Sequence, residues 1–355
     1  MSPRNFIILA VVTFVTVAGA VFALHEQPAT RQALQPEEPV FPLLQARLND
    51  AAKLEVVTAE GEVVLLREEG SGTWTLPGKQ GYPARQNGVR EVILDLRALK
   101  VAEPKTRKPE GFARLEVEDV EAEDAQSRLV RVSAADGTVL AEALFGRDRP
   151  GALGDASGGI YYRRPGGAQA WLAAGTLELP QDERAWLQTD VVHVAANTVA
   201  AIEVTHADGS RFAASRPSAE ERNFELAALP EGRKAAAGKT AQLGSALAFV
   251  SFAEVAPAAE IDFVAAPNRT VVTTFDGVAV TVELGEAEGE LWAKVSATLG
   301  EDAPEDEEAR AAAEAQVTEI TARTEGWAYR LDDHVVKRLL PKVEAYLEAA
   351  PEPAS

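Results

Sequence analysis

An internal repeat constrains the fold of this chain more than any other feature. Residues 54–66 contain two apolar runs around a Glu-Gly dipeptide, and residues 202–212 repeat that pattern around Asp208-Gly209. A second pair of runs turns at Asp136-Gly137 in the first half and at Asp276-Gly277 in the second. Acid-glycine dipeptides between such runs are typical of tight β-hairpins. We therefore expect two related units rich in antiparallel hairpins.

Each half also contains a stretch between its hairpins with helical spacing of apolar residues. In the first half the apolar residues recur at steps of three or four, at Val89, Val92, Ile93, Leu96 and Leu99. In the second half they recur less regularly, at Leu243, Leu247, Val250 and Phe252. One further strand, at 160–162 and at 291–295, closes each unit. The pattern predicts an α+β fold, with an N-terminal transmembrane helix, two repeated antiparallel-hairpin-plus-helix units and a C-terminal helix.

The length of 355 residues is too great for one small core and fits this division into units. We expect a membrane anchor or signal segment at 1–24 and a proline-rich tether at 25–47. The first α+β repeat is expected at 48–180 and the second at 181–300. Residues 301–355 are expected to form an acidic linker followed by a strand and a helix.

Residues 6–24 carry no charged side chain. At about 1.5 Å per residue this segment would span roughly 28 Å, close to the thickness of a bilayer core. We interpret it as a membrane anchor, with apolar positions that include Phe6, Ile8, Val12, Val17 and Phe22. Arg4 precedes the segment, so the positive-inside rule places the bulk of the chain in the periplasm of a bacterium, attached to the inner membrane. A cleavable signal peptide is the alternative, and a buried core helix is a third interpretation.

Composition excludes several classes of protein. The net charge of -20 disfavours binding to nucleic acid, because the chain would repel phosphate backbones. The absence of cysteine excludes disulfides, thiolate catalysis and cysteine-type zinc sites. The four histidines are scattered and never stand four residues apart, as a helical metal site would need. We therefore expect no metal and no cofactor.

The sequence shows no catalytic motif. Gly238-Lys239-Thr240 resembles the end of a phosphate-binding loop but lacks the earlier glycine at the required spacing, and a helix start is the simpler interpretation. The abundant carboxylates include no pair that stands out for acid-base chemistry. We expect the protein not to be an enzyme, with no catalytic residue. The tryptophans read mainly as core, but Trp171, Trp186 and Trp327 are candidates for a ligand or docking surface.

The order of several short motifs resembles a bacterial family known as domain of unknown function DUF4340. The motifs are Leu179-Pro180 followed by Trp186-Leu187, the paired Asp-Gly hairpins, and the closing Gly326-Trp327-Ala328-Tyr329. The resemblance covers roughly residues 48–347. Members of that family are often described beside ABC-transporter components of the gliding-motility type. The resemblance therefore implies ABC-type permease and ATPase subunits as partners, and it implies no catalytic residue.

Two functional hypotheses follow. The first is a non-catalytic, membrane-anchored periplasmic auxiliary subunit of an ABC-type transport or envelope system. The alternative is a periplasmic module that binds a glycan or a lipid, which would need its aromatic side chains on one exposed face. A hydrolase built on scattered carboxylates is a third and weaker hypothesis, and it would need a concave site with converging polar groups.

Overall fold

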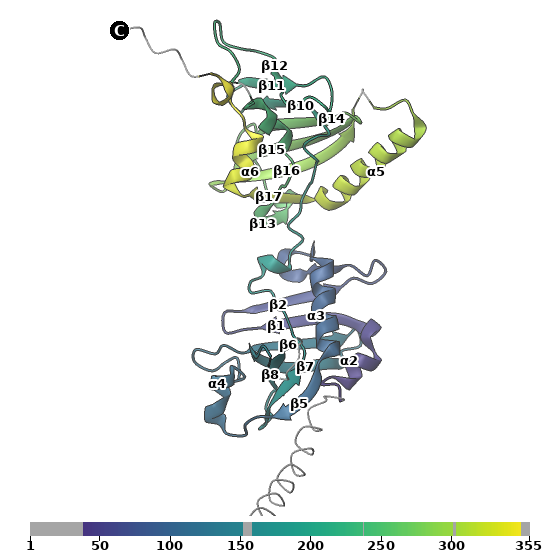
Figure 1. The fold of residues 1–355 in the computed structure, drawn as a ribbon, viewed down its shortest axis with the longest axis vertical. Helices are drawn as coiled ribbons and strands as arrows, with labels where there is room; N and C mark the ends of the chain where they lie inside the picture. Colours follow the sequence, from purple (N-terminus) through teal and green to yellow (C-terminus); the bar gives the residue numbers. More distant parts are fainter. Residues whose placement is uncertain (1–37, 152–157, 237, 301–302, 349–355) are drawn as a thin grey trace, which may run out of the picture. The chain divides into compact units, whose positions relative to one another are not determined.

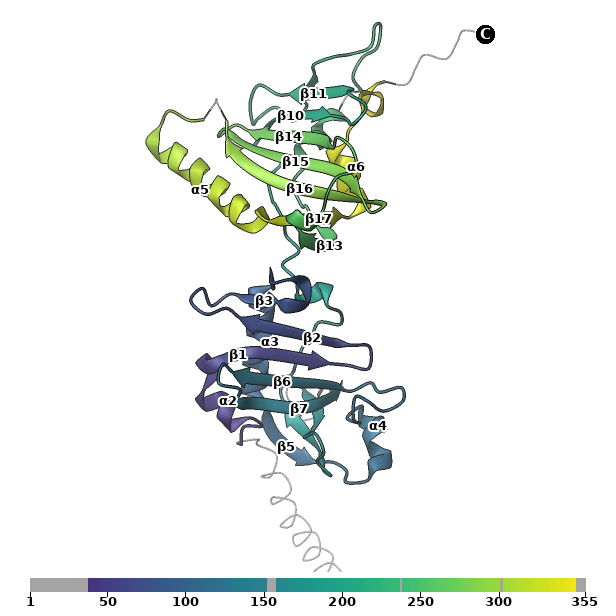
Figure 2. The ribbon, with the colours of Figure 1, turned by 180° about the vertical axis from the view of Figure 1, so that it is seen from behind.

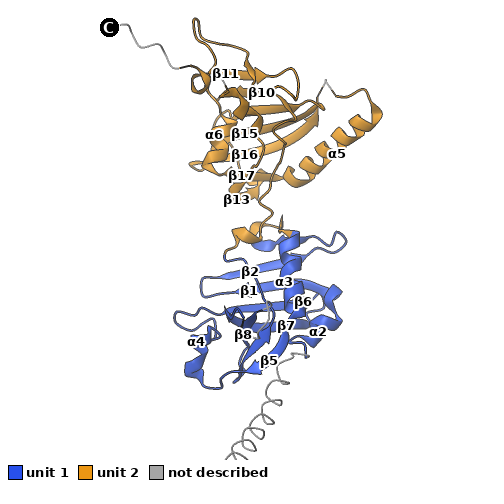
Figure 3. Ribbon diagram, viewed as in Figure 1, with its two compact units in different colours: residues 1–78, 86–181 blue, residues 79–85, 182–355 orange. Residues whose placement is uncertain are grey.

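The computed structural model describes residues 38–151, 158–236, 238–300 and 303–348. They form two compact units, one of residues 38–78 and 86–181 and one of residues 79–85 and 182–348 (Figure 3). The expected α+β class is wrong. Strands dominate the described residues of both units, which are built on two large antiparallel sheets with few helices (Figure 1).

The first unit is an antiparallel sheet with one main helix. Its strands follow the spatial order β3-β2-β1-β6-β7-β8-β9-β5. They are β1 (Ala51–Val57), β2 (Glu62–Arg67), β3 (Trp74–Leu76), β5 (Lys100–Pro104), β6 (Arg128–Ala134), β7 (Val139–Asp148), β8 (Gly159–Arg163) and β9 (Ala170–Ala174). Its α-helices are α2 (Pro42–Ala46), α3 (Gln86–Ala98) and α4 (Phe112–Leu115).

Helix α3 covers one face of this sheet and leaves part of the other face open. Val89, Val92 and Leu96 of α3 are buried, as are Leu54 and Val56 on β1. Figure 2 shows the opposite face of β1, β2, β6 and β7 with no helix across it. An antiparallel sheet tolerates this arrangement when one face is apolar and the other carries polar side chains. The open face is therefore where functional side chains can gather.

The second unit repeats the strand order of the first. Its sheet runs β12-β11-β10-β14-β15-β16-β17-β13. The strands are β10 (Val199–Thr205), β11 (Arg211–Ser215), β12 (Glu225–Leu226), β13 (Phe252–Pro257), β14 (Asn268–Thr274), β15 (Val278–Ala287), β16 (Glu290–Leu299) and β17 (Trp327–Leu331), and β4 (Tyr82–Pro83) also falls within this unit. Its α-helices are α5 (Glu307–Thr324) and α6 (Asp333–Leu339).

The two sheets also agree in register. Glu55 pairs with Val64 on one side and Arg131 on the other, and Glu203 pairs in the same way with Ala213 and Val271. Short 3-10 helices complete both units. They are η1 (Leu48–Asp50), η2 (Pro77–Lys79), η3 (Pro109–Gly111), η4 (Arg184–Trp186), η5 (Thr240–Ser245), η6 (Ala258–Glu260) and η7 (Val343–Tyr346).

The error in the fold class has two physical sources. The second helical stretch is only the 3-10 helix η5, because Gly238 and Gly244 interrupt a segment that lacks a regular apolar stripe. In addition, the sequence pattern predicts no strand at β5 or β13, which are edge strands that pair with β9 and β17. Those partners lie far along the chain, so no local periodicity marks either strand.

The transmembrane helix expected at residues 6–24 lies outside the described residues. Among the residues that the structure does describe, no helix is both long and apolar enough to cross a bilayer. Part of the expected tether packs into the first unit. Phe41 and Leu44 are buried there, and the Val40 main-chain nitrogen donates to the Leu99 carbonyl oxygen.

In each unit a segment of the chain crosses one end of the outer face of the sheet, the face opposite to its main apolar layer. This crossing segment contains residues 112–117 in the first unit and residues 261–263 in the second. In the first unit, Arg163 on β8 donates from Nε to the Val117 carbonyl oxygen at 2.7 Å, and its guanidinium lies 4.6 Å from the Phe112 ring. In the second unit, Lys294 on β16 donates to the Ile261 carbonyl oxygen at 2.7 Å, with its ammonium 5.0 Å from the Phe263 ring. A sheet cation thus holds the crossing segment in both units.

Glycine makes room for both crossing segments. A Cβ atom at Gly146 would overlap the main-chain oxygen of Leu115, and one at Gly285 would overlap the ring of Phe263. Neither glycine has a positive φ, so the requirement is space rather than backbone conformation. The two sheets therefore share this close contact at a glycine as well as a strand order.

Replacing Gly285 with alanine should lower the free energy of unfolding by about 1–3 kcal/mol, the usual cost of overpacking. The second substitution Phe263→Ala should remove the overlap and recover part of that loss, so the two changes should be non-additive in urea denaturation. Gly146→Ala is the matched comparison, because its obstacle is a main-chain oxygen that no side-chain truncation removes. Additive free energies for Gly285→Ala and Phe263→Ala would contradict the proposed contact.

Candidate functional site

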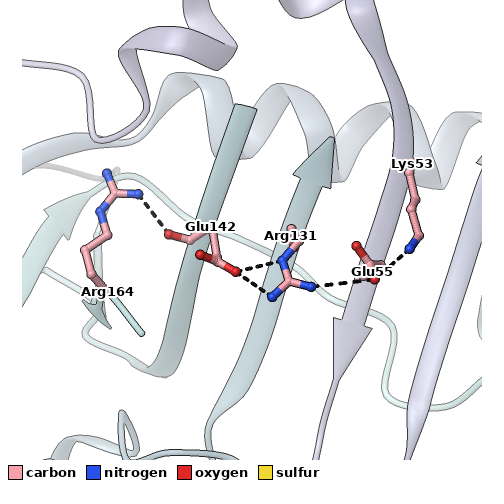
Figure 4. A network of polar contacts seen from close by, with 5 residues as sticks. All are labelled: Lys53, Glu55, Arg131, Glu142 and Arg164. Carbon is pink, nitrogen blue, oxygen red and sulfur yellow. Dashed lines mark hydrogen bonds and ion pairs between the residues drawn. The ribbon is translucent and has the colours of Figure 1, made fainter. Parts of the chain in front are cut away.

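A row of charged side chains crosses the open face of the first sheet (Figure 4). Lys53 and Glu55 extend from β1, Arg131 from β6 and Glu142 from β7, while Arg164 follows the end of β8. Alternate residues of a strand point to the same face, so Lys53 and Glu55 stand on the side opposite to buried Leu54. We call these five residues the charged row.

The charged row is joined by hydrogen bonds and ion pairs from one end to the other. Arg131 contacts Glu142 Oε1 from Nε at 2.7 Å and from Nη2 at 2.6 Å, and its Nη1 lies 3.7 Å from Glu55 Oε1. Lys53 Nζ lies 2.8 Å from the same Glu55 oxygen. Arg164 donates to the main-chain oxygen of Glu142 at 2.8 Å. Arg131 is thus held between two carboxylates.

The electrostatics of the row favour recognition over proton transfer. Hydrogen bonding to Glu142 raises the pKa of Arg131, so this guanidinium remains charged. The Glu55 side chain is only 9% exposed, and it is compensated by Lys53 and Arg131. Each of the two carboxylates has one oxygen engaged by a cation of the row. Fixed, alternating charges can instead orient a partner with complementary charges.

Shallow concavities and apolar side chains accompany the row. A concavity of about 590 Å³ is lined by Lys53, Glu55, Arg131 and Glu142 together with Leu66 and Val139. A smaller one of about 310 Å³ lies on the other side of Glu142, beside Leu43 and Arg164. Leu43, Leu66 and Val139 are 39–44% exposed. Protein docking surfaces combine apolar side chains with polar and charged groups, and both kinds are present on this face.

The second sheet shows that the fold does not require the charged row. The positions of the second sheet that match Lys53, Glu55, Arg131 and Glu142 in strand register are Ala201, Glu203, Val271 and Thr281. Only Glu203 is charged among them, and it is exposed. The crossing segments and their cations recur in both units, whereas the row occurs in one. We therefore take the row as the candidate functional site.

Sequence reasoning missed the row and named other residues. None of the tryptophans Trp171, Trp186 and Trp327 belongs to the row. Trp186 is buried, Trp327 packs at 4.9 Å against the ring of Tyr82, and Trp171 lies on β9 of the first unit. Their role as a ligand or docking surface stays a prediction. The anchor positions Phe6, Ile8, Val12, Val17 and Phe22 fall outside the described residues.

One sequence signal could have indicated the row. Lys53 and Glu55 alternate with apolar residues on β1, and the same alternation surrounds Arg131 on β6 and Glu142 on β7. Each charge is unremarkable by itself, and only the pairing of the three strands brings them together. Within the described residues, no group of three or more His, Asp or Glu side chains is placed to hold a metal ion.

The fold and this site define a protein of two like antiparallel sheets, one of which carries a charged open face. A family model described as "Domain of unknown function (DUF4340)" matches residues 74–265, more than half of the chain. The chain belongs to that family, and the resemblance noted from its motifs is confirmed. Neither the curated proteins nor the solved structures gave a match.

Substitution of Arg131 with methionine should destabilise the first unit by about 1–3 kcal/mol, because Glu55 would lose one of its two cations in a nearly buried position. Arg310→Met is a matched control, since Arg310 pairs with Glu314 on the exposed surface of α5. That pair should contribute less than about 0.5 kcal/mol. Urea denaturation of both variants measures the difference, and equal small effects would show that the row is not a stabilising network.

Proposed function

We propose that the protein is a non-catalytic auxiliary subunit of an ABC-type transport or envelope system, anchored in the bacterial inner membrane with its bulk in the periplasm. In this role the open face of the first sheet docks on a partner protein. The observation that carries the proposal is the charged row itself, which stands on one sheet, whereas the register-matched positions of the other sheet hold a single charge, Glu203.

The chemistry of the open face supports docking. A docking surface gains affinity from apolar side chains and gains orientation from charges. Leu66 and Val139 are exposed beside the row, while Arg131, Glu55 and Glu142 are fixed in place before a partner arrives. Charges that are already held in one geometry lose little side-chain freedom on binding. The face is therefore preorganised for a partner with complementary charges.

The location and the partner are supported by the sequence. The uncharged segment at residues 6–24 would hold the chain at the membrane, and Arg4 would keep the N-terminus in the cytoplasm. The resemblance to the family implies neighbouring ABC-type permease and ATPase subunits. A periplasmic protein could touch the permease directly, and it would meet the ATPase only through that permease.

Site-specific photo-crosslinking in intact cells tests the proposal. A crosslinking residue at Leu66 or Val139 should capture a permease subunit, because both side chains are exposed on the open face. The matched control is the same residue at Arg97, which is exposed on α3 and therefore on the covered side of the sheet. Mass spectrometry of the adducts identifies the partner.

The outcomes separate the alternatives. Capture of a permease from positions 66 and 139 but not from position 97 would support docking through this face. Equal capture from all three positions would mean proximity without a defined surface. Adducts of glycan or lipid alone would replace the docking role with a binding role.

A further inference from the structure

Another concavity of the first unit carries positive charge on this acidic protein. It has a volume of about 390 Å³ and lies where β2 and β3 meet the start of α3. Arg67 and Arg90 are its charged lining residues, and no Asp or Glu lines it. Its apolar wall includes Leu48, Ile93 and Leu94. The volume lies within the range of small-molecule sites.

Arg67 is fixed in position but only partly satisfied. Its Nη1 donates to the main-chain oxygen of Asn49 at 3.1 Å, and its side chain lies close to Gly72. Within the described part of the chain, Arg67 has no carboxylate partner. Among the acids near Arg67, Asp50 pairs with Arg47 at 2.7 Å and Glu68 accepts from Ser71 at 3.1 Å, while Glu69 lines neighbouring concavities with Arg67 but forms no ion pair with it. Several guanidinium N–H groups of Arg67 therefore remain available.

The register-matched arginine of the second unit, Arg216, has all three of its guanidinium nitrogens hydrogen-bonded to main-chain oxygens. Arg216 follows β11 as Arg67 ends β2, one residue after the register-matched Ser215 and Leu66. Its Nε, Nη1 and Nη2 donate to the main-chain oxygens of Val199, Glu221 and Ala196 at 2.7–2.9 Å. Its guanidinium lies 4.7 Å from the Phe224 ring. Arg216 is 8% exposed, whereas Arg67 lies at the surface of a concavity.

The two units also differ at a position close to this arginine, where the first unit has Arg90 and the second has Gly244. In the first unit Gln86 contacts the main chain of Trp74, and in the second Thr240 contacts the main chain of Phe224. Four residues further on stand Arg90 and Gly244. A Cβ atom at Gly244 would lie 2.8 Å from the Ala196 oxygen, so the second unit is closed by a tight contact there. The first unit has a second exposed guanidinium instead, with no ion pair to any described residue.

We infer that Arg67 and Arg90 form a binding site for a phosphate monoester carried on an apolar group. Guanidinium groups bind phosphate oxygens through charge-assisted hydrogen bonds. Two unpaired guanidiniums match the charge of a phosphate monoester near neutral pH. Leu48, Ile93 and Leu94 provide an apolar wall for the attached group. Arg67 also lines the concavity beside the charged row, but the inference concerns a phosphate ligand and the docking role concerns a protein partner, so either can fail without the other.

Two sources share this ligand chemistry, a lipid phosphate and a soluble phosphate ester. Isothermal titration calorimetry of the full chain in a non-ionic detergent distinguishes them, with dihexanoyl phosphatidic acid and glycerol 3-phosphate as probes. Binding of the lipid probe alone assigns the site to a lipid phosphate. Comparable binding of both would assign the site to a soluble phosphate ester and would contradict the role of the apolar wall. Dihexanoyl phosphatidylcholine, which lacks the monoester, controls for partition into detergent and should not bind.

Three variants test the residues. Arg67→Gln and Arg90→Gln should each weaken binding about tenfold, since each removes one charged donor. Arg97→Gln is the matched control, because Arg97 lies on the same helix, is exposed and does not line the concavity. Circular dichroism checks that all three variants fold. The inference is overturned if neither phosphate binds, or if Arg97→Gln weakens binding as much as Arg90→Gln does.

Discussion

The close approach of a crossing segment to a glycine in each sheet is the contact from which the rest of the architecture follows. Gly146 and Gly285 admit the segments that carry Phe112 and Phe263, and Arg163 and Lys294 hold those segments down. One end of the outer face is thereby covered by a crossing segment, which in the first unit includes the short helix α4. The other end remains open, because each sheet has its main apolar layer on the opposite face. The scaffold thus determines where a partner can approach.

What occupies the open end is not dictated by that scaffold. In the second sheet the positions that match the charged row hold Ala201, Val271 and Thr281 beside one exposed acid. An antiparallel sheet accommodates these residues as readily as it accommodates charged ones. A nearly buried ion network adds little net stability relative to apolar residues at the same positions. The row in the first sheet is therefore better explained by recognition than by folding. The two units act as an internal comparison that separates structural residues from functional ones.

The sequence predicted what is local and missed what is distant. The turns at Asp136 and Asp276 lie within single hairpins, so dipeptide chemistry and alternation were enough to find them. The edge strands β5 and β13 pair with strands far along the chain, and their own residues carry no marked periodicity. The charged row depends on three strands at once. The sequence contained its residues, but only strand pairing defined their register.

The arginine pair of the two units carries this reasoning one step further. Arg216 shows that a guanidinium at this corner of the fold can be satisfied by main-chain oxygens and a phenylalanine ring. Arg67 occupies the matching place with one such oxygen, beside a helix that presents Arg90 where the second unit has Gly244. Main-chain oxygens and an aromatic ring would satisfy an arginine in the first unit in the same way. Two unpaired cations are retained there on a chain of net charge -20, and an anionic ligand gives a physical reason for that arrangement.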